Sequence, residues 1–521
     1  MVNGIHIYDM HYRNRNVVDH VGEKNRSRCP GNEEVSDSNV NQGVDEEKEE
    51  ERIMEKCVPW FPSQPQKKRL KRVMVDRISA LHDSVLLHIL SFLNMQEAVC
   101  TSVLSKRWKS LWTSLSTVTF HNRRCLPEKS RPFVERVTRI LENYRAGNMK
   151  KFAVDFMYNS RYASHVDYWI LLAVQNKVED LDLRFHFCSQ IAVDQDVVEP
   201  HTLPHHVYFA PTLTSLSLLN CILGLNGAVA WRSLKSLSIT QVDLTEDAFE
   251  VILSGSPVLE YLKINACRGM NHIDINSASV KTLVIQNCEA EWLDTLLLEI
   301  SAPYIQSLHI LGTTYGRVFR LINVSSLVTA NLNYYSDALC HYTKLLLESL
   351  HHVKEINLGP YCIQILSMLE MLGWPSPPTS WKSLVLNAHL DEVDTPGILR
   401  LLLNSPSIET LIINKTRVGC SDLLLDSDVP DGGVICGISL VTGIMLPHLK
   451  TVKFAGYTGV GGLGAPTLEL ILFLLENANT LEKIIIVVSP GTDYRQDAQI
   501  LLSLPRSSPH VEIIFRRRIL Y

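Results

Sequence analysis

Three glycines near the C-terminus have the spacing of a phosphate-binding loop. Gly459, Gly461 and Gly464 fit G-x-G-x-x-G, in which missing side chains let the backbone approach a pyrophosphate at a helix N-terminus. An expected strand, TVKF, precedes the loop, and an expected helix, TLELILFLL, follows it. Ala465 and Pro466 separate the last glycine from that helix, and we expect no alternating βαβ domain around it. We therefore interpret the segment as a strand-to-helix loop. Nucleotide-dependent catalysis ranks third, after the two non-enzymatic hypotheses developed below.

The histidines and cysteines form no catalytic or metal-binding pattern in the sequence. The chain has 19 histidines and 12 cysteines, but no CxxC, H-E-x-x-H or G-x-S-x-G. Two adjacent pairs, His205-His206 and His351-His352, would point to opposite faces of a strand and make poor ligands for one metal. We predict no catalytic residue, no metal site and no cofactor, with the thiols free and mostly buried in a reducing compartment.

Composition indicates a folded chain of more than one domain. The 521 residues are 46% hydrophobic and 20% charged, and the net charge of -5 gives a pI near 6.4. This balance argues against nucleic acid or an anionic membrane as the main partner, because phosphate binding needs a basic surface. No apolar run approaches 18 residues, and the opening residues lack a secretory pattern. We expect an intracellular protein in the nucleus, the cytoplasm or both.

The densest apolar stretch, residues 76–120, predicts three short helices. In the first, Val85–Leu93, a core stripe at the i, i+3, i+4, i+7 spacing is formed by Leu86, Ile89, Leu90 and Leu93. Three further apolar residues widen the arc to roughly 220°, about twice what a surface helix needs. These three are Val85, Leu87 and Phe92. One apolar face is therefore predicted to be left over after the core has packed.

Capping residues predict where the other two helices begin. Asn94 and Glu97 form a variant capping box, and Ser105 is a candidate N-cap for a helix containing Trp108. A unit of about 40 residues buries too little surface to be robust alone. Burying three or four leftover apolar side chains at ~1.5–3 kcal/mol each favours association. We therefore expect a protein partner for this segment.

This stretch resembles an F-box. The resemblance covers about 45 residues and is carried by Leu81, Leu86, Ile89, Leu90, Leu93, the run VLSKRW from Val103 to Trp108, and Leu111-Trp112. It implies docking onto a Skp-type adaptor, and through it onto a cullin, in a ubiquitin ligase of the SCF type. The residues implied in adaptor binding are Leu81, Leu86, Leu87, Ile89, Leu90, Leu93 and Trp108, whose core and interface roles the sequence does not separate.

One position departs from the F-box pattern. The family has Leu-Pro at the start of the first helix, whereas His82 follows Leu81 here. Proline suits the first helical position because its missing N–H would be unpaired there, and Asp83 offsets part of the loss by placing a carboxylate near the helix N-terminus. The departure leaves open a rival hypothesis, a repeat scaffold that no longer engages the ligase.

From Met149 the chain repeats a six-residue pattern of apolar positions. Thirteen units are present: MKKFAV, VEDLDL, LTSLSL, LKSLSI, LEYLKI, VKTLVI, IQSLHI, LVTANL, VKEINL, WKSLVL, IETLII, LKTVKF and LEKIII. Their spacing, mostly 21–29 residues, is the signature of leucine-rich repeats, and Cys221, Cys267 and Cys288 occupy the Cys position of three units. Each short strand buries alternate residues against its neighbours, so stacking builds one continuous core.

The predicted fold class is α/β: a small three-helix F-box followed by an irregular leucine-rich-repeat solenoid, with a disordered N-terminal tail. Helical spacing between the strands predicts helices in EDAFEVILSGSPVLEYL, ALCHYTKLLLESLHHV, PGILRLLLNSPSIETL and TLELILFLLENANTLEKI. The strands are expected to form the inner face. The layout resembles plant F-box proteins with leucine-rich repeats and an FBD-like C-terminal region.

The predicted boundaries follow composition and pattern. Residues 1–75 form a charged, disordered tail, 76–122 the F-box, 123–148 a connecting helix ended by Gly147, 149–440 the repeats, and 441–521 terminal repeats with the FBD-like region. Residues 421–443 are expected to be a long loop. The basic run from Lys67 to Arg72 is a nuclear-import signal, a phosphate-binding patch or a solvated linker.

A ligand surface, if present, is expected on the inner face of the solenoid. Candidate target-binding residues are Arg184, Tyr261, Lys263, His309 and Lys453. For any one of them, plain solvation of a polar side chain is the alternative. We predict a non-enzymatic adaptor whose F-box binds a Skp-type protein and whose repeats bind an unidentified target protein for ubiquitination.

Overall fold

The structure is a computed structural model. It describes residues 78, 80–123, 130–145, 147–187, 199–225, 227–290, 297–336, 340–374, 378–391, 393–416, 445–457, 465–488 and 494–517. The chain divides into two units, Met1–His82 and Asp83–Tyr521, and the elements below belong to the second. The predicted tail, the basic run 67–72, the loop 421–443 and the glycines 459–464 lie outside the described residues.

The second unit begins with a helical segment, residues 83–114. Its elements are α2 (Asp83–Leu90), α3 (Met95–Cys100), the 3-10 turn η1 (Thr101–Val103), α4 (Trp108–Leu111) and the 3-10 turn η2 (Trp112–Ser114). The predicted three helices are confirmed, although the first ends at Leu90 rather than at Leu93. It ends early because Asn94 is extended, with φ −68° and ψ 161°, which starts α3.

The predicted capping box is confirmed at α3. The backbone N–H of Glu97 donates to Asn94 Oδ1 at 2.9 Å, and the Asn94 N–H donates to Glu97 Oε2 at 3.1 Å. This reciprocal pair satisfies two amides that the helix leaves unpaired. The prediction for Ser105 is confirmed in part. Helix α4 is assigned from Trp108, with Arg107 as its N-cap residue, but the Ser105 hydroxyl accepts from Trp108 N–H at 3.5 Å, a long hydrogen bond, and the Ser105 carbonyl accepts from Lys109 N–H at 3.2 Å.

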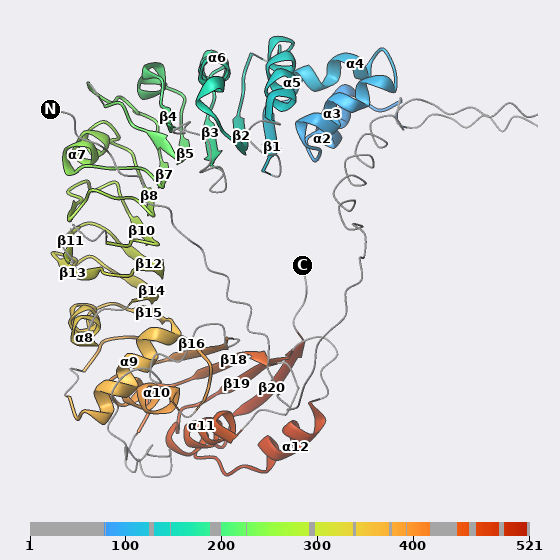
Figure 1. Cartoon of the computed structure of the whole chain (residues 1–521). Helices are drawn as coiled ribbons and strands as arrows, with labels where there is room; N and C mark the ends of the chain where they lie inside the picture. Colours follow the sequence, from blue (N-terminus) through green and yellow to red (C-terminus); the bar gives the residue numbers. More distant parts are fainter. Residues whose placement is uncertain are drawn as a thin grey trace, which may run out of the picture. The chain divides into compact units, whose positions relative to one another are not determined.

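The rest of the unit is organised around a parallel sheet of 15 strands that follow one another in chain order (Figure 1). The strands are β1 (Thr117–Asn122), β2 (Lys151–Met157), β3 (Asp180–His186), β5 (Ser215–Leu219), β7 (Ser236–Thr240), β8 (Tyr261–Asn265), β10 (Thr282–Gln286), β12 (Ser307–Thr313), β14 (Thr329–Tyr335), β15 (Glu355–Leu358), β16 (Ser383–Ala388), β17 (Thr410–Lys415), β18 (Thr451–Tyr457), β19 (Lys483–Val488) and β20 (Glu512–Arg517).

All thirteen predicted repeat units are strands of this sheet. The fourth residue of each unit pairs with the fourth residue of the next, from Phe152 through Leu308 to Ile484. These thirteen side chains are all buried. The register follows from the side-chain period of two, because a slip of one residue would turn every buried side chain outward.

The sheet has one more strand at each end than the thirteen units predicted. Strand β1 pairs with β2 through Val118 and Phe152, and β20 pairs with β19 through Ile513 and Ile484. Residues 115–120 read LSTVTF, which fits the repeat pattern, but they also fall within the stretch that resembles an F-box. In the last unit His510 takes the first apolar position, which weakens the pattern.

Helices and small sheets connect the strands. The helices are α5 (Arg131–Glu142), α6 (Ala163–Gln175), α7 (Glu246–Ser254), α8 (Cys340–Ser349), α9 (Pro360–Met371), α10 (Asp394–Leu403), α11 (Ala465–Asn477) and α12 (Arg495–Ser503). The four helices predicted between strands are α7, α8, α10 and α11; α6, α9 and α12 were not predicted. Short strands form two further sheets, β4 (His201–Thr202) with β6 (Cys221–Ile222), and β9 (His272–Asp274) with β11 (Leu297–Ser301) and β13 (Val318–Ile322).

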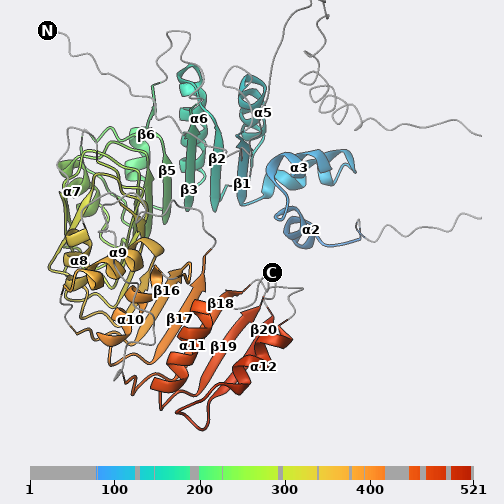
Figure 2. The same ribbon diagram turned by 60° about the horizontal axis from the view of Figure 1, so that its bottom comes forward.

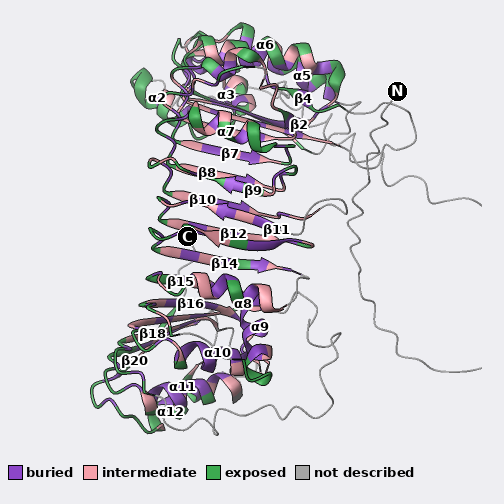
Figure 3. Ribbon diagram, turned by 90° about the vertical axis from the view of Figure 1, so that its left-hand side faces the viewer, coloured by how far each residue is buried: buried purple, intermediate pink, exposed green. Residues whose placement is uncertain are grey.

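The two faces of the large sheet differ in what covers them. Helices α5 to α12 lie along one face (Figures 1 and 2), and in the part of the chain that the structure describes no helix lies on the other. Burial alternates along most strands, as Figure 3 shows. We call the face without described helices the open face. The sequence-based expectation of polar residues flanking the buried ones is confirmed there.

Candidate functional site

The helical segment separates its apolar residues into a core and an exposed set. Leu86 and Leu90 are fully buried, and Trp108 is 5% exposed, so these three predicted adaptor residues form the core. Ile89 and Leu93 are 41% and 38% exposed. Leu87 and Leu81 are partly exposed, Leu81 lying in the first unit. The assignment of these residues to adaptor binding stays a prediction.

Four apolar residues that were not among the predicted adaptor residues are also exposed. Phe92 is 77% exposed, Val103 82%, Leu104 63% and Val85 43%. Val85 and Ile89 are one turn apart on α2, so they share a helical face. Large apolar side chains left in water on a small unit indicate a surface that a partner covers. With Ile89 and Leu93, these four define what we call the exposed apolar set.

An ion pair holds the two ends of the helical segment together. Arg107 Nε donates to Asp83 Oδ1 at 2.7 Å, joining the first residue of α2 to the residue before α4. Both side chains are largely in water, so the pair adds little to the free energy of unfolding. Its effect is to fix how α2 lies against α4, which orients the exposed residues of α2.

On the open face, the five predicted target residues lie on four strands. Arg184 is on β3, Tyr261 and Lys263 on β8, His309 on β12 and Lys453 on β18. Lys263 and His309 share a row two strands apart, about 10 Å at the usual strand spacing. Lys453 continues the row five strands further, about 24 Å away. The residues therefore share a face without converging on one point.

Two of these side chains have partners within the sheet. Arg184 Nε donates to Asp182 Oδ1 at 2.8 Å, and His309 Nε2 lies 3.0 Å from Ser307 Oγ. Burial lowers the pKa of His309, which favours its neutral form at physiological pH. Their participation in target binding stays a prediction.

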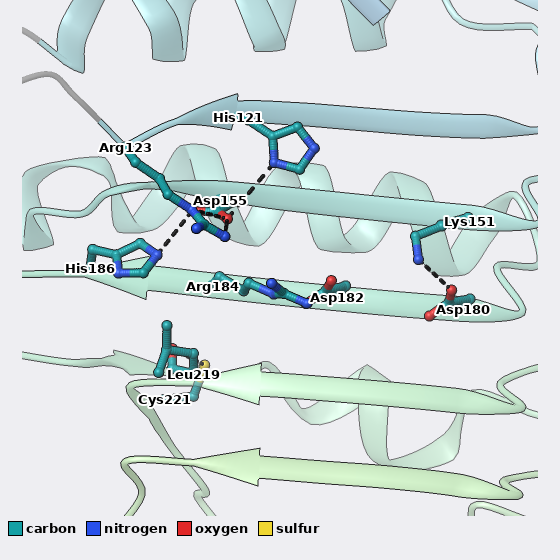
Figure 4. A network of polar contacts seen from close by, with 10 residues as sticks. All are labelled: His121, Arg123, Lys151, Asp155, Asp180, Asp182, Arg184, His186, Leu219 and Cys221. Carbon is teal, nitrogen blue, oxygen red and sulfur yellow. Dashed lines mark hydrogen bonds and ion pairs between the residues drawn. The ribbon is translucent and has the colours of Figure 1, made fainter. Parts of the chain in front are cut away.

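A buried carboxylate that the sequence analysis missed lies at the start of the open face (Figure 4). Asp155 on β2 is 1% exposed. Arg123 Nε donates to its Oδ2 at 2.6 Å, and His186 Nε2 lies 3.0 Å from its Oδ1. His121 Nδ1 is 3.8 Å from Oδ2. Because Asp155 pairs in register with His121 and Arg184, its place beside charged neighbours was readable from the repeat alignment.

The charges around Asp155 outweigh its burial. Burial alone would raise the pKa of this carboxyl group, but the Arg123 hydrogen bond and the positive potential of His186 and Arg123 lower it. The pKa of Arg123 is raised by the same partner. The arrangement ties β1, β2 and β3 together as an ion-paired network.

The cysteines and histidines support no catalytic assignment. Among the six described cysteines, Cys100 is exposed and Cys340 half-buried, while the other four are buried, and none of the six forms a disulfide bond. Burial raises the pKa of Cys267 to about 11, so the thiolate nucleophile is disfavoured. Neither histidine pair lies in a strand: His205-His206 begin a 3-10 turn, and His351-His352 follow α8.

The described ranges contain neither a metal cluster nor a membrane-spanning helix. No cluster of three or more His, Cys, Asp or Glu there could hold a metal ion, and no helix there is long and apolar enough to cross a membrane. The glycines 459–464 connect β18 to α11, which leads to the parallel strand β19. Strand β18, helix α11 and strand β19 therefore form one parallel strand–helix–strand unit of the repeat sheet. The expectation that no alternating βαβ nucleotide-binding domain surrounds the glycines stays a prediction.

Family models match both parts of the chain. One described as "At1g61320/AtMIF1, LRR domain" matches residues 140–511, well over half of the sequence. An F-box domain model matches residues 78–119. The chain belongs to the plant F-box/LRR-repeat family. Its helical segment is therefore the F-box, and its 15-stranded sheet is the leucine-rich-repeat domain.

Curated relatives of this F-box/LRR-repeat protein come from Arabidopsis thaliana. "F-box/LRR-repeat protein At3g03360" is 30% identical over 363 residues, covering 65% of this chain and 70% of the relative. "Putative F-box/LRR-repeat protein At5g02930" is 29% identical over 362 residues, covering 66% and 73%. "F-box protein At5g03100" is 30% identical over 320 residues, covering 58% and 95%. The two domains and these relatives support a substrate-adaptor role. The predicted FBD resemblance stays a prediction.

Proposed function

We propose that this protein is the substrate-recognition subunit of an SCF-type ubiquitin ligase. The F-box docks onto a Skp-type adaptor and through it onto a cullin, and the open face of the repeats captures a target protein. Catalysis belongs to the partner enzymes, and this chain is not an enzyme. The observation that carries the proposal is the exposed apolar set on the F-box.

The arrangement of the F-box explains why a partner is required. Its core is closed by Leu86, Leu90, Trp108 and their neighbours, so the exposed set is not needed for internal packing. Covering apolar surface contributes ~25 cal/mol per Å², and Phe92 and Val103 are more than three-quarters exposed. Association with an apolar groove of an adaptor would remove that surface from water.

Co-purification of the full chain with a Skp-type adaptor tests the proposal. Phe92→Asp with Val103→Asp places charges in the proposed interface, and we expect adaptor binding to fall at least tenfold. Substituting Leu86 or Leu90 instead would disrupt the core, since both are fully buried. Leu345→Asp on α8, at a residue that is 56% exposed, is the matched control and should leave binding unchanged. Full binding by the double variant would contradict the proposal.

The rival function is a repeat scaffold that no longer engages the ligase. His82 in the usual proline position favours it, because the first helix loses a preorganised start. A native chain that binds no adaptor, together with His82→Pro that does, would support the scaffold. Equal binding by both would remove it.

We propose the nucleus, the cytoplasm or both as the location of the protein. The basic run between Lys67 and Arg72 supports nuclear import by its composition. Replacing its five basic residues with alanine in a fluorescent fusion should reduce the nuclear fraction. An unchanged distribution would assign the run to the linker instead.

A further inference from the structure

The last strands of the open face carry an aliphatic stripe. Pairing in register aligns one residue from each of five neighbouring strands: Val385, Ile412, Lys453, Ile485 and Ile514. In the first strands the same row reads Thr119, Ala153, Asp182, Ser217 and Ser238. The row therefore changes from small and polar to aliphatic along the sheet.

The stripe is partly exposed, unlike the residues beside it. Ile412 and Ile485 are half-buried, whereas Leu411 and Ile484 next to them are fully buried on the helix-covered face. Figure 2 shows β16 to β20 side by side, with α10, α11 and α12 on one face only. At about 4.8 Å per strand, five strands span roughly 19 Å, the length of about six extended residues.

Three basic side chains lie around the stripe on the open face. Lys453 lies within it, and Lys483 and Arg516 lie on the same face of β19 and β20. Among the described residues none of the three forms an ion pair, although Glu512 is beside Lys483 in register. On the first strands, by contrast, Lys151 pairs with Asp180 at 2.8 Å. Among the described residues, Lys453, Lys483 and Arg516 thus outnumber Glu512 on the open face of the late strands, which leaves a net positive charge around an aliphatic centre.

We infer that the open face of β16–β20 binds an acidic protein segment that carries aliphatic side chains. The inference rests on the proposed function and names the chemistry of its target. Aliphatic side chains of the segment would cover the stripe, and its carboxylates would meet Lys453, Lys483 and Arg516. Carboxylate partners raise specificity and association rate through charge complementarity.

Binding of labelled peptides to the full chain tests the inference. The probe is a fluorescein-labelled twelve-residue peptide of alternating Ile and Glu, and its counterpart has Lys in place of each Glu. We expect the acidic peptide to bind at least tenfold more tightly than the basic one. The double variant Lys453→Glu with Lys483→Glu should reduce that affinity at least tenfold. Arg136→Glu, at an exposed residue of α5 on the helix-covered face, is the control and should change it less than twofold.

Three results would overturn the inference. One is equal binding of the acidic and basic peptides, the second is an equal loss of affinity in Arg136→Glu, and the third is no binding of the acidic peptide at all. A single-stranded RNA of 20 nucleotides forms a separate arm. Tighter binding of that RNA, with displacement of the peptide, would assign the basic residues to phosphate and also overturn it.

Adaptor co-purification on the same preparations keeps the two proposals distinguishable. The double variant should retain adaptor binding, because its substitutions lie on the open face of the repeats. If the native chain does not bind the adaptor, that result counts against the proposed ligase role but not against the peptide-binding inference. Circular dichroism of each variant shows that the repeats remain folded.

Discussion

The first and last strands of the solenoid have the same row of buried apolar residues, but their charged side chains differ in whether they form ion pairs. Around β1 to β3, Asp155, Asp180 and Asp182 each pair with a basic side chain. Around β18 to β20, Lys453, Lys483 and Arg516 form no ion pair among the described residues. Charges that are paired within the sheet serve the fold, whereas unpaired ones are available to a partner. The buried apolar residues are alike in both regions and do not reveal this difference in ion pairing.

Two buried carboxylates extend the comparison. Asp155 has Arg123 and His186 beside it, and its pKa is lowered. Asp394, at the start of α10, is fully buried. Its Oδ2 accepts from the N–H groups of His389 and Leu390 at 2.7 and 3.0 Å, while Oδ1 has no hydrogen-bond partner among the described residues. Burial, aided by Asp391, raises its pKa to about 6. Burial raises the pKa of both carboxyl groups, and the hydrogen bonds and positive charges beside Asp155 reverse that shift, whereas the backbone hydrogen bonds to Asp394 do not.

The largest losses of stability should come from substitutions of the buried apolar residues of the strands, and they should be similar in the first and last strands. Leu181 on β3 and Leu411 on β17 are both fully buried. Each Leu→Ala change leaves a cavity, and we expect a loss of ~2–5 kcal/mol in the free energy of unfolding. Urea denaturation followed by circular dichroism measures it. A near-neutral result at one site would show that the two regions differ in packing as well as in charge.

Asp155→Asn should have the next largest effect. The amide keeps the shape but loses the charge that Arg123 and His186 face, so we expect a loss of ~1–3 kcal/mol at pH 7. Because the folded pKa is lowered, the stability that the carboxylate contributes is present above its unfolded pKa of about 4 and is lost as the pH falls through the folded pKa. The difference from the native chain should therefore shrink at low pH.

Asp180→Asn is the control for that measurement. Its side chain is 31% exposed and pairs with Lys151, so less than about 1 kcal/mol is expected. An Asp155→Asn effect that is equally small, or independent of pH, would show that the network around Asp155 is not ion-paired in solution.

Asp394→Asn should act with the opposite sign. With a folded pKa near 6, the native chain is stabilised by the protonated form below about pH 4 and loses that contribution as the pH rises through 6. The variant should be more stable than the native chain at pH 7, by ~1–2 kcal/mol, and its stability should vary less between pH 4 and 7. Thermal melts across that range measure the effect, with exposed Asp274→Asn as the control. A variant that is less stable at pH 7 would contradict the assignment.

The smallest effect on stability is expected at Lys453. Because this side chain has no ion pair among the described residues, Lys453→Glu should change the free energy of unfolding by less than ~0.5 kcal/mol. A larger loss in urea denaturation would mean that the late strands also use their charge for folding, and the contrast between the two regions would be weakened.

Much of the fold was readable from residue pattern. The six-residue repeat identified thirteen strands and their register, because only one register buries the fourth residue of every unit, from Phe152 to Ile484. Asn94 and Glu97 located the start of α3. The pattern failed where two motifs overlapped, at residues 115–120, and where one position was polar, at His510. Helix α9 was missed because it is apolar on nearly every side, which hides the helical period.

The candidate sites were less predictable than the fold. Leu86 and Ile89 have equivalent spacing in the sequence, yet one is fully buried and the other is 41% exposed. Which face of α2 meets the core depends on how α4 and η2 pack against it. The hydrogen-bonding partners of Asp155, Arg123 and His186, are 32 and 31 residues away along the chain. The repeat register indicates that charged residues lie on neighbouring strands, but only the stacked strands decide which of them reach the carboxylate.

The amino-acid sequence by itself determined the repeat architecture, the F-box helices and the presence of surplus apolar side chains, because these depend on local periodicity and capping. Only the tertiary structure decided which apolar residues stay in water and which charges find partners. The reason is physical: burial and ion pairing depend on distances between strands and helices, and those distances exist only after the repeats have stacked.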